Sequence, residues 1–140
     1  MTSPRIKSAL VAARRRGVEV KAIFDPDALK EKGSMVAELA AGGIQVMVDN
    51  FHQPGLAHNK VMIIDGATVI TGSFNFTRAA ESRNAENLLV IQDPALAAVY
   101  ERNFNAHLAH SSALGEAEIA PPRNYHRRHY YRAYRWRNYW

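Results

Sequence analysis

The sequence predicts an α/β fold, built from short apolar strands that alternate with helices along the chain. Apolar residues recur at helical spacing after Ser3 and after Asp93, while runs of β-branched apolar residues lie between these segments. Two of these runs flank the dipeptide Asp65-Gly66, which is typical of a tight turn between antiparallel strands. At 140 residues the chain is long enough for one domain with a modest core.

Three helices are predicted from their start and stop signals. Ser3 fits an N-cap with proline at the first helical position, and Gly17 ends this helix. A second helix is predicted over residues 35–41, before a pair of glycines. Asp93 precedes another proline and opens a helix that is predicted to run to about His110.

Five strands are predicted from apolar runs that suit a buried, pleated surface. They span residues 18–24, 44–48, 61–64, 69–70 and 85–91. The third and fourth form the predicted hairpin, and the fifth carries Glu86 close to its start.

The most specific signal in the chain is the stretch H-N-K-V-M-I-I-D-G-A-T-V-I-T-G-S-F-N, residues 58–75. Six of its positions fit the pattern H-x-K-x4-D-x6-G-S-x-N. These positions are His58, Lys60, Asp65, Gly72, Ser73 and Asn75. At an average residue frequency of about 5%, a chance match is on the order of 10^-8 per start point.

The predicted hairpin brings the polar residues of this stretch together. A two-residue loop at 66–67 pairs Lys60 with Ser73. The same register pairs His58 with Asn75. Because side chains two apart on a strand share a face, these four groups are expected to form one polar patch.

Such a patch suits a phosphodiester. Lys60 supplies a compact positive charge, and Ser73 and Asn75 supply neutral donors for the non-bridging oxygens. His58 is the candidate nucleophile, which attacks phosphorus through a neutral ring nitrogen. Glu86 is the candidate acceptor for the other ring nitrogen, because a glutamate in an apolar strand is costly to bury without a partner.

The leaving alkoxide needs a proton donor, and the chain carries a single copy of the motif. A two-fold dimer would bring a second His58 into the same site. One histidine would attack while the other protonates the leaving group, and the roles would reverse when the phosphohistidine is hydrolysed. The sequence therefore predicts a homodimer that shares one active site.

The motif resembles the signature of the phospholipase D superfamily. Two longer stretches resemble the small bacterial Nuc-type endonucleases of that superfamily. They are A-L-V-A-A-R-R-R-G-V-E-V-K, residues 9–21, and G-S-F-N-F-T-R-A-A-E-S-R-N-A-E-N-L-L-V, residues 72–90. The resemblance implies a mixed β-sheet flanked by helices. Because Nuc-type members carry a strand–helix–strand segment before the helix that begins here at Ser3, it also implies an N-terminally truncated fold.

The resemblance also implies roles for single residues. They are a nucleophile or acid at His58, phosphate contacts at Lys60, Ser73 and Asn75, an orienting carboxylate at Glu86, and structural roles at Asp65 and Gly72. It further implies a homodimer that cuts DNA and RNA with little sequence preference and needs no metal or other cofactor.

The last part of the chain differs in composition from the rest. We expect a catalytic domain over residues 1–112 and a basic, aromatic tail over residues 113–140. Residues 121–140 hold six arginines, both tryptophans and no acidic residue, so the chain's formal charge of +5 resides there. The candidate nucleic-acid contacts are Arg123, Arg127, Arg128, Arg132, Arg135, Trp136 and Arg137. An anionic membrane surface and a purely solubilising extension remain open as alternatives.

Composition excludes several other classes of protein. The absence of cysteine excludes disulfide frameworks and thiolate metal sites, and the six histidines show no spacing typical of zinc sites. His107 and His110 are expected on the exposed side of the last helix. No stretch is long enough to span a membrane. The start lacks an apolar signal region, so we expect a cytoplasmic chain as written, or a periplasmic or secreted one if a signal precedes it.

The sequence therefore favours a metal-independent, low-specificity endonuclease that works through a phosphohistidine. Two alternatives remain open: a lipid phosphodiesterase of the same superfamily, and a non-catalytic nucleic-acid-binding remnant.

Overall fold

The computed structural model describes residues 1–50 and 56–115 of the chain. The tail residues proposed for nucleic-acid contact, from Arg123 to Arg137, lie outside the described residues. The elements in chain order are α1 (Pro4–Arg15), β1 (Lys21–Phe24), α2 (Pro26–Lys30), α3 (Val36–Ala41), β2 (Gln45–Asp49), β3 (Val61–Ile64), β4 (Thr68–Gly72), α4 (Arg78–Ser82), β5 (Leu88–Gln92), α5 (Pro94–Leu108) and β6 (Ser111–Ala113).

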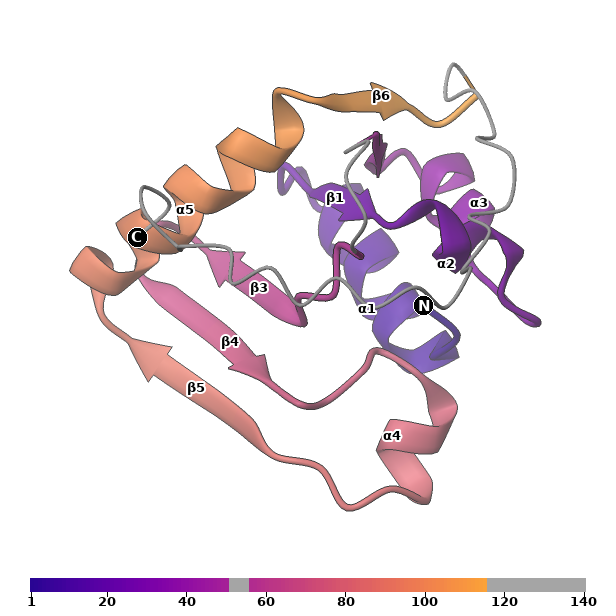
Figure 1. The fold of residues 1–140 in the computed structure, drawn as a ribbon, viewed down its shortest axis with the longest axis horizontal. Helices are drawn as coiled ribbons and strands as arrows, with labels where there is room; N and C mark the ends of the chain where they lie inside the picture. The colour runs from indigo at the N-terminus through magenta and orange to yellow at the C-terminus, as the bar shows by residue number, and fades with distance from the viewer. Residues whose placement is uncertain (51–55, 116–140) are drawn as a thin grey trace, which may run out of the picture.

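The strands form two three-stranded sheets (Figure 1). In the first sheet, of order β1-β2-β6, β1 runs parallel to β2 and β6 runs antiparallel to it. The second sheet, of order β3-β4-β5, is antiparallel throughout. The predicted α/β class is confirmed, but the expected single mixed sheet is divided: within residues 1–50 and 56–115 no strand pairing joins the two sheets.

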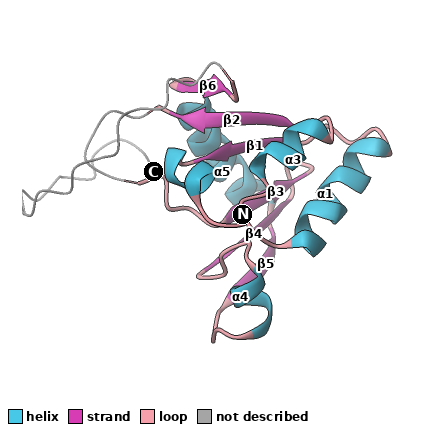
Figure 2. Cartoon of the chain, turned by 90° about the vertical axis from the view of Figure 1, so that its right-hand side faces the viewer, coloured by secondary structure: helices cyan, strands magenta, loops and turns pink. Residues whose placement is uncertain are grey.

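Helix α5 connects the two sheets by packing. It lies against β3 and β4 of the second sheet and against β2 and β6 of the first. Figure 2 shows the sheets one above the other, with α1 and α3 together on one side. Between β1 and β3 lies a cavity of about 410 Å³, lined in part by Phe24, Val61, Tyr100 and Phe104.

The predicted helix starts are confirmed. The Ser3 hydroxyl accepts a hydrogen bond from the Ile6 amide at 3.1 Å, which caps α1. The Asp93 carboxylate accepts from the amides of Ala95 and Leu96 at 2.8 and 3.1 Å, which caps α5. These caps satisfy amide groups that have no partner inside the helix.

Three short elements have no counterpart in the sequence prediction. Helices α2 and α4 have five residues each, which is too short for an apolar period to be visible. Strand β6 is a polar three-residue segment, Ser-Ser-Ala, held by its pairing with β2. The pairing with β2 rather than a local pattern therefore sets β6.

The loop of the β3–β4 hairpin is one residue longer than predicted. Ile64 pairs with Thr68, which leaves three residues between the strands. Asp65 and Gly66 have φ values of 53° and 61°, the positive values that a type I′ turn requires. The predicted pairing of Lys60 with Ser73 is therefore wrong by one position. Such a one-residue slip turns the side chains of one strand to the other face.

The predicted strand around Glu86 is also wrong at its start. Strand β5 begins at Leu88, so Glu86 lies in the connection that precedes it. Leu88, Leu89 and Val90 are exposed, and Glu86 is only partly buried. The argument that an apolar strand would bury this carboxylate therefore does not hold.

The main hydrophobic core lies around α3 and the first sheet. Its buried members are Met1, Val36, Leu39, Ile44 and Val46. Phe76, which follows β4, packs against this core, and its carbonyl accepts from the amides of residues 2 and 3. The connection that follows the motif is thus held by the N-terminal core.

Leu39→Ala should lower the free energy of unfolding by about 2–5 kcal/mol, because Leu39 is 0% exposed and its truncation leaves a cavity. Leu89→Ala is the matched control, since Leu89 is 56% exposed and its loss should change stability by only about 0.5 kcal/mol. Urea denaturation followed by circular dichroism measures both changes. Equal losses in the two variants would contradict the position of the core.

Candidate active site

The motif residues come from three connections in the fold. His58 and Lys60 precede β3, Ser73 and Asn75 follow β4, and Glu86 precedes β5. Because β4 and β5 are antiparallel neighbours, the end of one strand meets the start of the other. This pairing brings Ser73 and Glu86 together, although a helix separates them in the chain.

Glu86 accepts hydrogen bonds on both carboxylate oxygens. The Ser73 hydroxyl donates to Oε2 at 2.5 Å, and the Asn84 side-chain amide donates to Oε1 at 2.9 Å. The Ser73 hydroxyl in turn accepts from the Asn87 amide at 3.1 Å. Ser73, which follows β4, is therefore held by hydrogen bonds to Glu86 and Asn87, which precede β5.

Hydrogen bonding stabilises the ionised form of Glu86. The bond from Ser73 is the main cause that lowers the pKa of this carboxyl below its ordinary value, and the bond from Asn84 is the second. Attraction to Lys60 lowers the pKa further, whereas partial desolvation acts in the opposite direction. Glu86 is therefore an anion at neutral pH.

Lys60 lies in the electrostatic field of the same carboxylate. Partial burial lowers the pKa of its ammonium group, and attraction to Glu86 opposes that shift. Its Nζ donates a hydrogen bond to the His58 carbonyl at 2.6 Å. The Lys60 ammonium group thus bonds the backbone of His58 and is attracted to the carboxylate of Glu86.

The structure does not form the predicted contact between His58 and Glu86. His58 is exposed, and no hydrogen bond joins its ring to any residue in the described part of the chain. Asn75 is also exposed, and only its backbone carbonyl is bonded, accepting from the Thr77 amide at 2.7 Å among the described residues. Ser73, Glu86 and Lys60 are gathered, while the ring of His58 and the amide of Asn75 lie outside this hydrogen-bond network.

Gly72 is required by the close approach of two strands. A Cβ atom at this position would overlap the backbone oxygen of Asn87 and lie 2.7 Å from its Oδ1. Asn84 and Asn87, which complete the network, were not predicted. Their only signal in the sequence is that they fall within the stretch 72–90 that resembles the Nuc-type enzymes.

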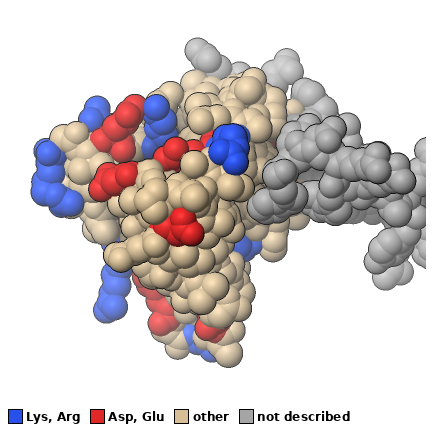
Figure 3. Space-filling model, turned by 90° about the vertical axis from the view of Figure 1, so that its left-hand side faces the viewer, with Lys and Arg blue, Asp and Glu red and all other residues tan. Residues whose placement is uncertain are grey.

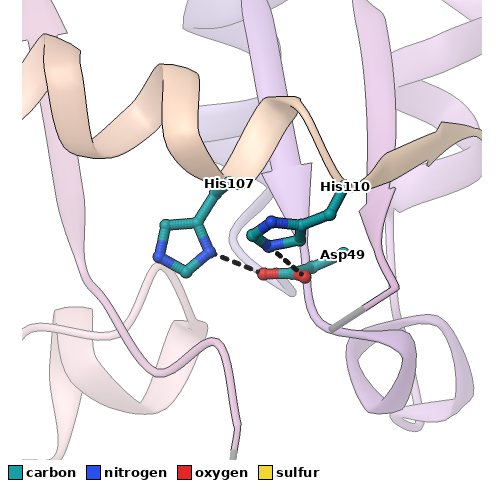
Figure 4. Close-up of side chains that lie close together, drawn as sticks. All are labelled: Asp49, His107 and His110. Carbon is teal, nitrogen blue, oxygen red and sulfur yellow. Dashed lines mark hydrogen bonds and ion pairs between the residues drawn. The ribbon is translucent and has the colours of Figure 1, made fainter. Parts of the chain in front are cut away.

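A second polar cluster contradicts the expected exposure of two histidines. His107 and His110 both approach Asp49, at 2.8 and 3.1 Å, rather than facing solvent from α5 (Figure 4). Their ring nitrogens and the carboxylate oxygens of Asp49 are the donor set in the described residues that could hold a metal ion.

Charges of both signs are mixed on one face of the molecule. On the face shown in Figure 3, lysine and arginine residues lie among aspartate and glutamate residues, and broad areas carry neither. No helix between residues 1–50 or 56–115 combines the length and apolar character needed to cross a membrane.

Comparison with known proteins gives consistent relatives. A family model described as "Cardiolipin synthase, PLD-like domain" matches residues 1–108. Phospholipase D from Rickettsia bellii (strain RML369-C) is 51% identical over 104 residues, which cover 74% of this chain and 51% of that protein. Mitochondrial cardiolipin hydrolase from Xenopus laevis is 35% identical over 103 residues, 74% of this chain and 48% of that protein. The chain spans about half the length of these curated relatives.

The fold has a close structural counterpart. Nuc from Salmonella typhimurium, a phospholipase D family member, superposes with a TM-score of 0.75 at 40% sequence identity. The match covers 81% of this chain and 76% of the Nuc chain. The predicted α/β fold of this type is therefore confirmed.

Ser73→Ala should raise the pKa of Glu86 toward its ordinary value, because it removes the hydrogen bond that most stabilises the ionised carboxyl. Asn84→Ala is the matched control and should raise the pKa less, since its bond is the second cause. A carbon-13 NMR titration of the Glu86 carboxyl measures both. An unchanged pKa in Ser73→Ala would exclude the hydroxyl as the dominant partner.

Proposed function

Because this chain belongs to the family of phospholipase D-like domains, we propose that it is a phosphodiesterase that cleaves nucleic acid. The observation that carries the proposal is the network at the end of β4. There Ser73 donates to Glu86, and Lys60 acts on the same carboxylate while it holds the backbone of His58. Lys60 thus bonds the backbone of the candidate nucleophile His58 and is attracted to Glu86, which accepts from the Ser73 hydroxyl. A cation, a hydroxyl donor and an anionic acceptor are the groups that cleavage through a phosphohistidine uses.

In the proposed reaction His58 attacks phosphorus through a neutral ring nitrogen, a P–N bond forms, and the bond from phosphorus to the leaving oxygen breaks. The His58 of a second subunit gives its proton to the leaving alkoxide. That second histidine then takes a proton from water as the water oxygen attacks phosphorus, and the P–N bond breaks to release His58. Lys60 and Asn75 stabilise the negative charge that develops on the non-bridging oxygens.

Substrate binding changes the partner of Ser73 in this mechanism. A serine hydroxyl has one proton to donate, and Ser73 donates it to Glu86 Oε2. When the hydroxyl turns to a phosphate oxygen, Oε2 becomes available to the ring N–H of His58. Glu86 would then orient the histidine and stabilise its positive charge in the transition state.

Nucleic acid is proposed as the substrate on two grounds. One is the 40% identity to Nuc across most of both chains, together with the resemblance of residues 72–90 to Nuc-type endonucleases. The other is the run of arginines and aromatic residues at 121–140, whose composition suits the phosphates and bases of single strands.

A lipid phosphodiester is the second candidate. It is supported by the names of the relatives from Rickettsia bellii and Xenopus laevis, phospholipase D and mitochondrial cardiolipin hydrolase. It is also supported by exposed apolar residues beside the site: Leu88, Leu89 and Val90 are 47%, 56% and 62% exposed at the start of β5. Acyl chains would bury such a surface.

The intact chain should cleave plasmid DNA in excess EDTA, and His58→Ala should abolish cleavage, because the proposed nucleophile is a side chain and not a metal-bound water. Release of the headgroup from phosphatidylcholine and cardiolipin vesicles is measured with the same two proteins. Lipid turnover without DNA cleavage would select the second candidate. DNA binding that survives His58→Ala, with no turnover of either substrate by the folded intact chain, would overturn both and leave a non-catalytic binder.

Glu86→Gln should lower kcat on DNA by on the order of 10²-fold or more, because an amide cannot stabilise the imidazolium that forms at His58. The affinity for DNA should change little, since Glu86 acts through the histidine and not on the substrate. Single-turnover kinetics and fluorescence anisotropy separate the two effects. Full turnover by the variant would remove Glu86 from the mechanism.

A further inference from the structure

We propose that Asp49, His107 and His110 form a binding site for one Zn²⁺ ion, separate from the candidate active site (Figure 4). Asp49 is the last residue of β2, His107 lies in the last turn of α5, and His110 lies just beyond the end of that helix. Two imidazoles and one carboxylate are a donor set that zinc takes in proteins, with a water molecule as the fourth ligand.

The donor atoms are already close to the spacing of a zinc site. His107 Nδ1 lies 2.8 Å from Asp49 Oδ2, and His110 Nε2 lies 3.1 Å from Asp49 Oδ1. The donor atoms of all three residues lie within 4.8 Å of one another. Zinc bonds of about 2.0–2.1 Å in a tetrahedron place their donors about 3.3 Å apart, so small side-chain movements would complete the site.

The backbone holds the three side chains in register. Asp49 pairs with Ser111 in the β2–β6 ladder, and the amide of Asn50 donates to the His110 carbonyl at 3.2 Å. The Ser111 hydroxyl donates to the His107 carbonyl at 2.8 Å. These bonds hold the end of α5 against the end of β2, so little ordering is needed when an ion binds.

The carboxylate of the proposed site is buried, whereas the two imidazole rings are partly exposed. The Asp49 side chain is 3% exposed, and a buried carboxylate is costly unless cationic or hydrogen-bonding groups face it. The side chains of His107 and His110 are 31% and 35% exposed, so solvent reaches both imidazole rings. Imidazole nitrogens favour zinc over Mg²⁺ or Ca²⁺, which take oxygen ligands.

The simpler alternative is a metal-free tie, in which both rings donate N–H groups to Asp49. The metal-free tie predicts no zinc binding, and the proposed site predicts it. In the zinc form the facing ring nitrogens lose their protons and turn their lone pairs to the ion. The ion would then join α5 to the first sheet and raise the thermal stability of the chain.

Isothermal titration of ZnCl₂ into the full chain, freed of metal by EDTA and then desalted, tests the site at neutral pH. We expect about one ion per chain, with the affinity lowered at least about tenfold in His110→Ala and in Asp49→Asn. Asp49→Asn keeps a side-chain oxygen that can accept hydrogen bonds from the two rings, so this variant is expected to fold. It therefore tests zinc binding by itself if His110→Ala does not fold. Bound Co²⁺ should give the visible absorption of a tetrahedral site, which these variants lose.

His58→Ala is the matched control, because it removes a histidine that does not belong to the cluster, and it should bind zinc as the parent chain does. No binding by the parent, equal binding by Asp49→Asn, or loss of binding in His58→Ala would each overturn the proposal. Cleavage of DNA in EDTA tests the proposed function independently, since the zinc site takes no part in that chemistry.

Discussion

The close approach of β4 and β5 at Gly72 is the constraint on which the candidate active site depends. Because Gly72 has no Cβ, its backbone can approach that of Asn87, and the two strands pair up to this point. Ser73 then bonds Asn87 through its backbone amide and its hydroxyl. The same approach carries Glu86 to the Ser73 hydroxyl. A larger residue at 72 would separate the strands and with them the donor and the carboxylate. Gly72 is thus needed for the two strands to come close enough to form the polar network.

The ionised carboxyl of Glu86 determines how this network can act on His58. Glu86 is exposed enough to be solvated, yet two hydrogen bonds and the charge of Lys60 hold its pKa below the ordinary value. A carboxylate that stays ionised can stabilise a cationic histidine, which a neutral acid cannot. The stability that its ionisation contributes is present above the pKa of the unfolded chain, and it is lost as the pH falls through the lower pKa of the folded chain. The Ser73 hydroxyl has a single proton, so it can donate either to Glu86 or to a phosphate oxygen of the substrate, but not to both at once.

Local chemistry in the sequence was sufficient to predict the α/β class, the capped starts of α1 and α5, and the turn at Asp65-Gly66. The register of the hairpin was not predictable, because one additional loop residue is compatible with the same turn dipeptide and reverses the faces of the strand. Glu86 was assigned to a strand from its apolar neighbours, which the structure leaves exposed on β5. The cluster of Asp49 with His107 and His110 depends on the polar strand β6, and no local pattern reveals a strand that only its partner stabilises.

The proposed mechanism requires a covalent bond between His58 and phosphorus. Rapid acid-free quenching of the chain with a phosphodiester labelled in its phosphate, followed by peptide mass spectrometry, tests it directly. We expect an adduct on the peptide that contains His58 in which phosphorus keeps its remaining ester group. This adduct should be stable to alkali, labile to acid and absent from His58→Ala. Because Glu86 is proposed to stabilise the positive charge that forms on His58, Glu86→Gln should form the same adduct more slowly. Turnover of the substrate without any adduct at His58, or equal turnover in His58→Ala, would exclude His58 as the nucleophile.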